Sequence, residues 1–424
     1  MSIRSRKYAL LLTIPAFLHL IAFSICVFKY GKVDFVLFDL IFYAFFLIYL
    51  GGVLVLCRSD ESFGKATLLF YSIIIGVLIS DYAIRLYMPP QKFATPWLPM
   101  HRVSYASDAL PGITGKIELS VNKYGLRGPE VDLKQIRHKI LCVGGSTTES
   151  LYVTDQKTWP WILQDKLNEK LSDSVFVGNA GRSGHFTLNH EFMLKNYPLV
   201  DEFDWVVLLV GINDMGRLLR SDYQELKKRV AKDTMEAKYA YKSSPYYDRM
   251  MVNVILSFGK IEAQETQVIQ DPEGKWYDQM REIRRKALLH NEVTDIPAGL
   301  DPAIEQYKRD LLRIIEFCRE KKIKILLVTQ PTMYGAGLTE SQKSMLWENI
   351  DEKHAYSSEV LGVIIDRYND ALLELCKENG VPVIDLARML PKDISVFYDD
   401  CHFNISGSKK VADVLSDYFV SNLK

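Results

Sequence analysis

Ser146, His402 and Asp399 are residue types that together can activate a hydroxyl nucleophile. A serine hydroxyl reacts weakly at neutral pH until a base takes its proton, and an imidazole is suited to that task. Asp399 precedes His402 by three positions and could accept a hydrogen bond from the second ring nitrogen. This bond would fix the tautomer and stabilise the imidazolium. The three side chains predict attack of Ser146 on a carbonyl carbon.

A carbonyl oxygen under such attack becomes an oxyanion, which needs hydrogen-bond donors. The backbone N–H groups of Ser146 and Gly184 and the side-chain amide of Asn213 could supply three of them. Ser146 follows an apolar run and two glycines and opens an expected helix, where backbone N–H groups are unpaired. These three positions therefore predict an oxyanion hole.

Short apolar strands and amphipathic helices alternate from residue 139 onward. The expected strands are Lys139–Val143, Ser174–Val177, Asp204–Val210, Ile323–Thr329 and Val381–Leu386. The expected helices are Trp159–Leu171, Ala303–Arg319, Val360–Glu378 and one from about Ser406. This alternation predicts an α/β fold, with a five-stranded parallel sheet between helices. Ligands bind at the carboxyl ends of such strands, and Ser146, Gly184 and Asn213 all lie just past strand ends.

The segment Met215–Asp301 is too long for an ordinary strand-to-helix connection and is expected to be an insertion. It leaves the sheet beside Asn213, so it either borders the site or forms a solvated helical decoration.

Three apolar runs precede this domain, at Tyr8–Phe28, Phe35–Leu56 and Ala66–Ile84. Each is near the roughly 20 residues that cross a bilayer as a helix, which predicts three transmembrane helices in residues 1–88. Buried helices of a soluble protein are the alternative. The first run is longer than the ~7–15 apolar residues of a signal peptide, so we expect it to be retained.

The basic residues Arg4, Arg6 and Lys7 favour a cytoplasmic N-terminus. Three spans would then place the catalytic domain outside the cytoplasm, periplasmic or extracellular. A proline-rich juxtamembrane connector is expected at residues 89–138 and the catalytic domain at residues 139–424.

Several classes of protein and site are disfavoured by composition and motifs. The chain has 52 basic and 52 acidic side chains, so no net charge indicates a nucleic-acid partner. Its 6 cysteines show neither CxxC nor metal-like spacing, and no GxGxxG motif or P-loop follows the first strand. We therefore expect no metal, cofactor or disulfide framework.

Four blocks in this order resemble the SGNH (GDSL) hydrolases. The blocks are Gly144-Gly145-Ser146-Thr147-Thr148, Asn179…Ser183-Gly184, Gly211-Ile212-Asn213-Asp214 and Asp399…His402. The four letters of the family name fall on Ser146, Gly184, Asn213 and His402. The resemblance spans residues 139–424 and implies a flavodoxin-like three-layer α/β/α domain with a metal-free serine esterase mechanism.

The first block departs from the Gly-Asp-Ser-Leu form of the family, because Gly145 replaces the aspartate and Thr147 the leucine. Members with Gly-Gly-Ser-Thr-Thr also exist. Gly181 is an alternative to Gly184 as a donor, and Asp400 is an alternative to Asp399, although the family spacing is DxxH.

The main hypothesis is a membrane-anchored serine esterase that hydrolyses an acyl ester, an O-acetyl ester by preference, of a bacterial cell-envelope glycan or lipid. One alternative is an O-acyltransferase that passes the acyl group to a saccharide hydroxyl. Another is a catalytically silent envelope assembly or binding protein. The expected partners are the acylated substrate at the membrane surface and membrane lipid around the three helices.

Overall fold

The computed structural model describes residues 13–14, 47–49, 51–53, 59–87, 96–97, 102–106, 110–219 and 274–423. The chain divides into two compact units. One comprises residues 1–92 and 236–265, and the other comprises residues 93–235 and 266–424. All the predicted catalytic residues belong to the second unit.

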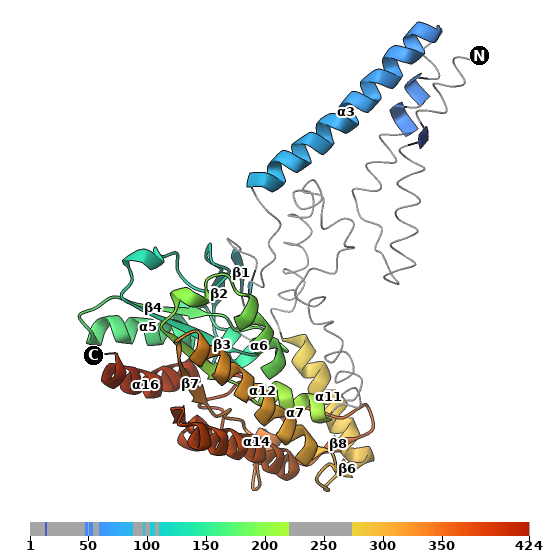
Figure 1. Ribbon diagram of the computed structural model, residues 1–424. Coiled ribbons are helices and arrows are strands. Elements are labelled where there is room, and N and C mark those ends of the chain that lie inside the picture. The colour runs from blue at the N-terminus through green and yellow to red at the C-terminus, as the bar shows by residue number, and fades with distance from the viewer. Residues whose placement is uncertain are drawn as a thin grey trace. The chain divides into compact units, whose positions relative to one another are not determined.

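A parallel sheet of five strands forms the centre of the second unit (Figure 1). In sheet order, the strands are β4 (Val175–Asn179), β3 (His138–Gly144), β5 (Trp205–Leu209), β7 (Lys324–Val328) and β9 (Val383–Ile384). Every residue of β4 and β5 is buried, as expected for strands covered on both faces. The chain adds strands on either side of β3, which is the strand order of a flavodoxin-like fold.

Two groups of helices pack on this sheet (Figure 1). The first group is α5 (Trp159–Lys170) and α16 (Ile405–Asn422), which contact each other. The second is α6 (Thr187–Asn196), α12 (Leu300–Glu320) and α14 (Ser358–Asn379), with α12 against both of the others. Right-handed crossovers between parallel strands place the two groups on opposite faces. The five strands and these helices fit the predicted α/β fold.

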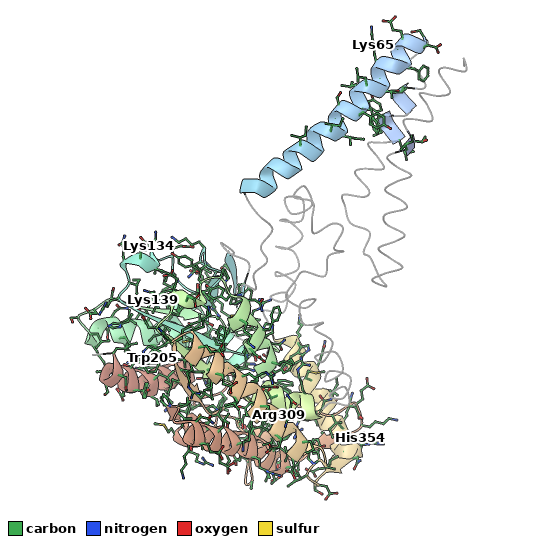
Figure 2. All side chains as sticks on the ribbon, in the orientation of Figure 1. Lys65, Lys134, Lys139, Trp205, Arg309 and His354 are labelled. Carbon is green, nitrogen blue, oxygen red and sulfur yellow. The ribbon has the colours of Figure 1, made fainter. Side chains whose placement is uncertain are left out.

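Trp205, the first residue of β5, shows how α16 closes over the sheet (Figure 2). Its ring centroid lies 6.0 Å from that of Tyr418 and 5.3 Å from that of Phe419, both on α16. The start of α16 is fixed by Asn404, whose side chain accepts from the Gly407 N–H at 2.9 Å. This cap fixes the chain just after His402.

Shorter elements connect the layers. They are η1 (Leu133–Gln135), α4 (Ser146–Glu149), η2 (Asp155–Lys157), η3 (Val200–Glu202), α7 (Ile212–Leu219), α13 (Glu340–Lys343) and α15 (Leu386–Met389). A two-residue parallel pair, β6 (Glu292–Val293) with β8 (Ala355–Tyr356), follows α11 (Lys275–His290).

The segment expected to be a connector contributes to the second unit. Its strands β1 (Arg102–Ala106) and β2 (Lys116–Ser120) form an antiparallel pair. Its apolar residues build a second core cluster with residues from the catalytic side. The buried members are Trp97, Leu110, Ile113, Ile117, Leu119, Val121, Leu151, Tyr152, Val153, Tyr277 and Tyr398. Residues 110–138 are therefore packed against the segment that follows Ser146.

The prediction of three transmembrane helices is wrong for the part of the chain that the structure describes. No helix there is sufficiently long and apolar to cross a membrane. The third run lies in α3 (Asp60–Tyr87). The first two runs lie almost wholly outside the described residues.

Candidate active site

Ser146, His402 and Asp399 form a continuous hydrogen-bonded chain. Ser146 Oγ lies 2.6 Å from His402 Nε2, although 256 positions separate the two residues. His402 Nδ1 lies 2.6 Å from Asp399 Oδ2. This arrangement lets the imidazole take the serine proton while the carboxylate faces the other ring nitrogen.

Two glycines place Ser146 at the end of β3, as the first residue of α4. A Cβ at Gly144 would lie 2.2 Å from Thr148 Oγ1, and one at Gly145 would lie 2.3 Å from Asn213 Nδ2. Both distances are far too short for a real contact. A side chain at Gly145 would therefore require the Asn213 amide to move from its position in this structure.

Asp399 is buried and accepts four hydrogen bonds, including that from His402 Nδ1. The others come from the backbone N–H of Cys401 at 3.0 Å, the N–H of His402 at 2.8 Å and the indole N–H of Trp347 at 3.2 Å. Burial raises the pKa of Asp399, but the charge of His402 and the hydrogen bonds from His402 and Cys401 outweigh burial and hold it below its usual value. The carboxylate is therefore charged at neutral pH.

The imidazole of His402 lies among aromatic rings. Tyr398 stacks on it with centroids 5.4 Å apart and planes 8° apart, and Tyr277 meets it edge-on at 6.1 Å. Burial lowers the pKa of His402, but the charge of Asp399 and its hydrogen bond raise it by more than burial lowers it. The pKa of His402 is therefore above its usual value. These contacts fix the ring plane that faces Ser146.

The adjacent acid, Asp400, points to a different set of partners. It accepts from Tyr334 Oη at 2.6 Å, Trp347 N at 2.7 Å and Glu348 N at 3.0 Å. Burial, followed by the charge of Asp399, raises its pKa to about 6. Asp400 thus holds the segment at Trp347 in place, whereas Asp399 faces the histidine.

The structure brings the predicted oxyanion donors Gly184 and Asn213 to the same edge of the sheet as Ser146. Asn213 Nδ2 donates to the carbonyl of His185 at 2.7 Å, which orients the amide and leaves its second hydrogen available. Gly184 is exposed and has φ of +72°. The N–H of Gly181 instead donates to Asn179 Oδ1 at 2.9 Å, so the geometry favours Gly184 as the donor.

Residues from the predicted insertion border this site. Trp276 and Tyr277 lie in the first turn of α11, and Trp276 is 45% exposed. The Trp276 ring lies 5.0 Å from that of Trp347, whose indole N–H donates to Asp399. Sequence reasoning missed Trp276, Tyr277 and Trp347, because no short motif or spacing links them to the four blocks. Tyr398 could have been noticed, since it directly precedes Asp399.

Asp399, Cys401 and His402 also form a group in which potential metal-ligating atoms lie within 4.8 Å of one another. The carboxylate and imidazole of this group already share a hydrogen bond. Burial raises the pKa of the Cys401 thiol well above its usual value, which disfavours the thiolate that a metal would need. The donor set suits proton transfer better than metal binding.

Residues 142–410 match the model of the GDSL-like lipase/acylhydrolase family. None of the curated proteins matches the chain. Similar solved structures include an acetyl xylan esterase, AlAXEase, with 14% identity over 66% of this chain and 98% of that chain and a TM-score of 0.35. A lipase/acylhydrolase from Enterococcus faecalis has 16% identity over 68% and 97%, with a TM-score of 0.37. A catalytic mutant of an acetylxylan esterase from Geobacillus stearothermophilus has 12% identity over 68% and 94%, with a TM-score of 0.36.

Proposed function

The chain belongs to the GDSL-like lipase/acylhydrolase family and is a serine ester hydrolase, and we propose that Ser146, His402 and Asp399 carry out its reaction. The hydrogen-bonded chain through these three side chains is the observation that carries the proposal. Removal of Ser146 or His402 would remove the nucleophile or its base, and removal of Asp399 would leave the imidazole without the carboxylate that orients it.

In the first half of the reaction, His402 Nε2 takes the proton of Ser146 Oγ as the oxygen attacks the ester carbonyl carbon. The oxyanion receives hydrogen bonds from the N–H groups of Ser146 and Gly184 and from Asn213 Nδ2. The carbon–oxygen bond to the alcohol then breaks, and the imidazolium protonates the leaving alkoxide. The acyl group remains on Ser146.

In the second half, His402 removes a proton from water, which attacks the acyl-enzyme. The tetrahedral species collapses, the carboxylic acid leaves, and Ser146 Oγ regains its proton. Throughout both halves, Asp399 keeps the Nδ1 proton of His402 in place and balances the positive ring.

For the substrate, we propose an O-acetyl or other short acyl ester of a cell-envelope saccharide. Support comes from the rings of Trp276 and Trp347, which lie in contact with each other next to Asp399. Tryptophan offers a broad apolar face with a polar N–H, which suits a sugar ring. The expected location of the catalytic domain outside the cytoplasm depended on Arg4, Arg6 and Lys7 together with three spans, and a reporter fused after Lys424 would test it.

The catalytic assignment is tested with the full chain, an aryl acetate and a fluorophosphonate. We expect one adduct, on Ser146, and loss of both labelling and hydrolysis in Ser146→Ala. Ser421→Ala removes an exposed helix serine and should behave as wild type. Labelling that persists in Ser146→Ala would contradict the proposal.

The substrate is tested with Trp276→Ala and its matched control Leu289→Ala, since Leu289 is also exposed on α11. Trp276→Ala should raise KM for an O-acetylated oligosaccharide and leave hydrolysis of the aryl acetate unchanged. Equal KM values in both variants would reject the saccharide contact. Transfer of the acetyl group to an added saccharide, with little free acetate, would identify a transferase.

A further inference from the structure

The segment that carries Gly184 is held by side chains on both sides of that glycine. On one side, Ser183 N donates to Glu149 Oε2 at 2.9 Å. On the other, the carbonyl of His185 accepts from Asn213 Nδ2 at 2.7 Å. Ser146 and Glu149 are the first and last residues of α4, so the nucleophile and the donor segment are tied to one short helix.

Packing does not hold Gly184 itself. A Cβ at this glycine would meet no described atom within 4 Å, and its φ of +72° lies where glycine is least constrained. The direction of its N–H therefore depends on the peptide groups that flank it. The His185 N–H, which lies in one of these groups, donates to Arg182 O at 3.2 Å and closes a turn around Gly184. The bonds at Ser183 N and His185 O hold the peptide groups just before and just after this turn.

Glu149 is placed to make the first of these bonds strong. Its side chain is buried, with the residue 1% exposed, and the Ser183 hydroxyl donates to the same oxygen as the Ser183 N–H. Arg182 Nη1 lies 3.9 Å from the other carboxylate oxygen. Burial raises the pKa of Glu149 above its usual value, although Arg182, the Ser183 bonds and Arg127 oppose the rise. A buried carboxylate is costly unless it is bonded in this way.

The backbone of Glu149 is also fixed, so its side chain acts from a rigid base. Arg127 Nη1 donates to the carbonyls of Glu149 at 2.6 Å and Ser150 at 2.7 Å. Asn179 Nδ2 donates to Thr148 O at 2.9 Å. A Cβ at Gly181 would lie 2.2 Å from Glu149 N, which shows how closely the two backbones approach. Little movement is possible between α4 and the segment before Gly184.

We propose that Glu149 is a positioning residue for the oxyanion hole: its carboxylate fixes Ser183 and thereby aims the N–H of Gly184 at the developing oxyanion. This inference rests on the proposed roles of Ser146 and Gly184. Glu149 takes no part in proton transfer and does not touch the reacting atoms. Its contribution is to the transition state, where the oxyanion exists.

Glu149→Ala should lower kcat for an aryl acetate by about 10- to 100-fold, below the ~10²–10³ expected for loss of a whole oxyanion donor. KM should change little, because the ground-state ester gains little from the hole. Glu149→Gln keeps an oxygen that can accept from Ser183 N, so it should retain most of kcat. Equal losses of kcat in the two variants would contradict the inference, because they would show that an oxygen accepting from Ser183 N does not maintain activity.

A thiono ester gives a readout that loss of stability would not move. Sulfur accepts hydrogen bonds weakly, so an intact oxyanion hole favours the oxygen ester over its thiono counterpart. Glu149→Ala should reduce that preference. Glu191→Ala removes another buried, ion-paired glutamate, and should change neither the preference nor kcat.

An unchanged kcat and an unchanged preference for the oxygen ester in a folded Glu149→Ala protein would overturn the inference. The proposed function would still stand if Ser146→Ala abolished activity. Hydrolysis that survived Ser146→Ala would instead overturn the proposed function. Thermal unfolding of each variant confirms that folded protein is compared.

Discussion

The indole nitrogen of Trp347 lies 3.2 Å from Asp399 Oδ2, the same oxygen that faces His402 Nδ1 at 2.6 Å. Trp347 thus shares with His402 the negative charge of one carboxylate oxygen. Because a hydrogen bond to a carboxylate disperses its charge, Trp347 tunes how strongly Asp399 stabilises the imidazolium.

We predict that Trp347→Phe moves the acid limb of kcat/KM to higher pH. Hydrolysis needs neutral His402, so activity rises as pH passes the pKa of that residue. Without the indole donor, Asp399 stabilises the imidazolium more, and the pKa of His402 rises further above its usual value. A net hydrogen bond of about 0.5–1.5 kcal/mol limits this shift to about one unit. A pH–rate profile of the aryl acetate measures it, and an unmoved limb would contradict the prediction.

Asp399→Asn should reduce kcat strongly, by as much as about 10⁴-fold, because an amide can favour the wrong imidazole tautomer. The pKa of His402 should fall, since the carboxylate that raises it is gone. The matched control is Asp400→Asn, whose side chain contacts Tyr334, Trp347 and Glu348. It should lower the melting temperature with a much smaller loss of kcat. Similar kinetic losses in both would leave the orienting role unassigned.

Asn213→Ala should lower kcat by ~10²–10³, because it removes one predicted oxyanion donor. KM should change little, since the bond forms in the transition state. Steady-state kinetics on the aryl acetate separate the two parameters. A rise in KM alone would place Asn213 in substrate binding, and a protein that failed to fold would make it structural.

Asp214 should make stability fall as pH rises from about 4 to about 7. Burial raises its pKa from 3.8 to about 7, so the folded state holds a proton that the unfolded chain loses at lower pH. Stability from this proton is fully present below the unfolded pKa and is lost as pH passes the folded one. The shift from 3.8 to about 7 limits this contribution to the free energy of unfolding to about 4 kcal/mol.

Asp214→Asn keeps an oxygen that can accept from Thr187 N, a bond of 3.2 Å in the structure, but cannot ionise. Its stability relative to wild type should therefore increase across the same pH window. Urea unfolding at several pH values measures the difference in free energy of unfolding between the variant and wild type. Taking this difference cancels the pH dependence that other buried acids contribute equally to both proteins. A difference that did not vary with pH would refute the assignment to Asp214.

The sequence was sufficient to predict the sheet because its signals are local. Buried strands such as Lys139–Val143 are continuous apolar runs, and amphipathic helices between them require a parallel arrangement. Polar residues after strand ends, including Ser146 and Asn213, had to meet at one edge for the same reason. The membrane prediction depended on apolar content alone, and none of the helices that the structure describes is long and apolar enough to cross a membrane.

The DxxH spacing favoured Asp399 over Asp400, and the tertiary structure shows the physical basis of that choice. Asp399 and Asp400 are adjacent acids, and the fold turns one toward His402 and the other toward Tyr334. The contacts of Trp347 and Glu149 likewise join segments far apart in the chain, at distances fixed by packing around the whole sheet. Residue type and spacing determine which chemistry is available, but the direction of each side chain depends on long-range contacts that no local pattern records.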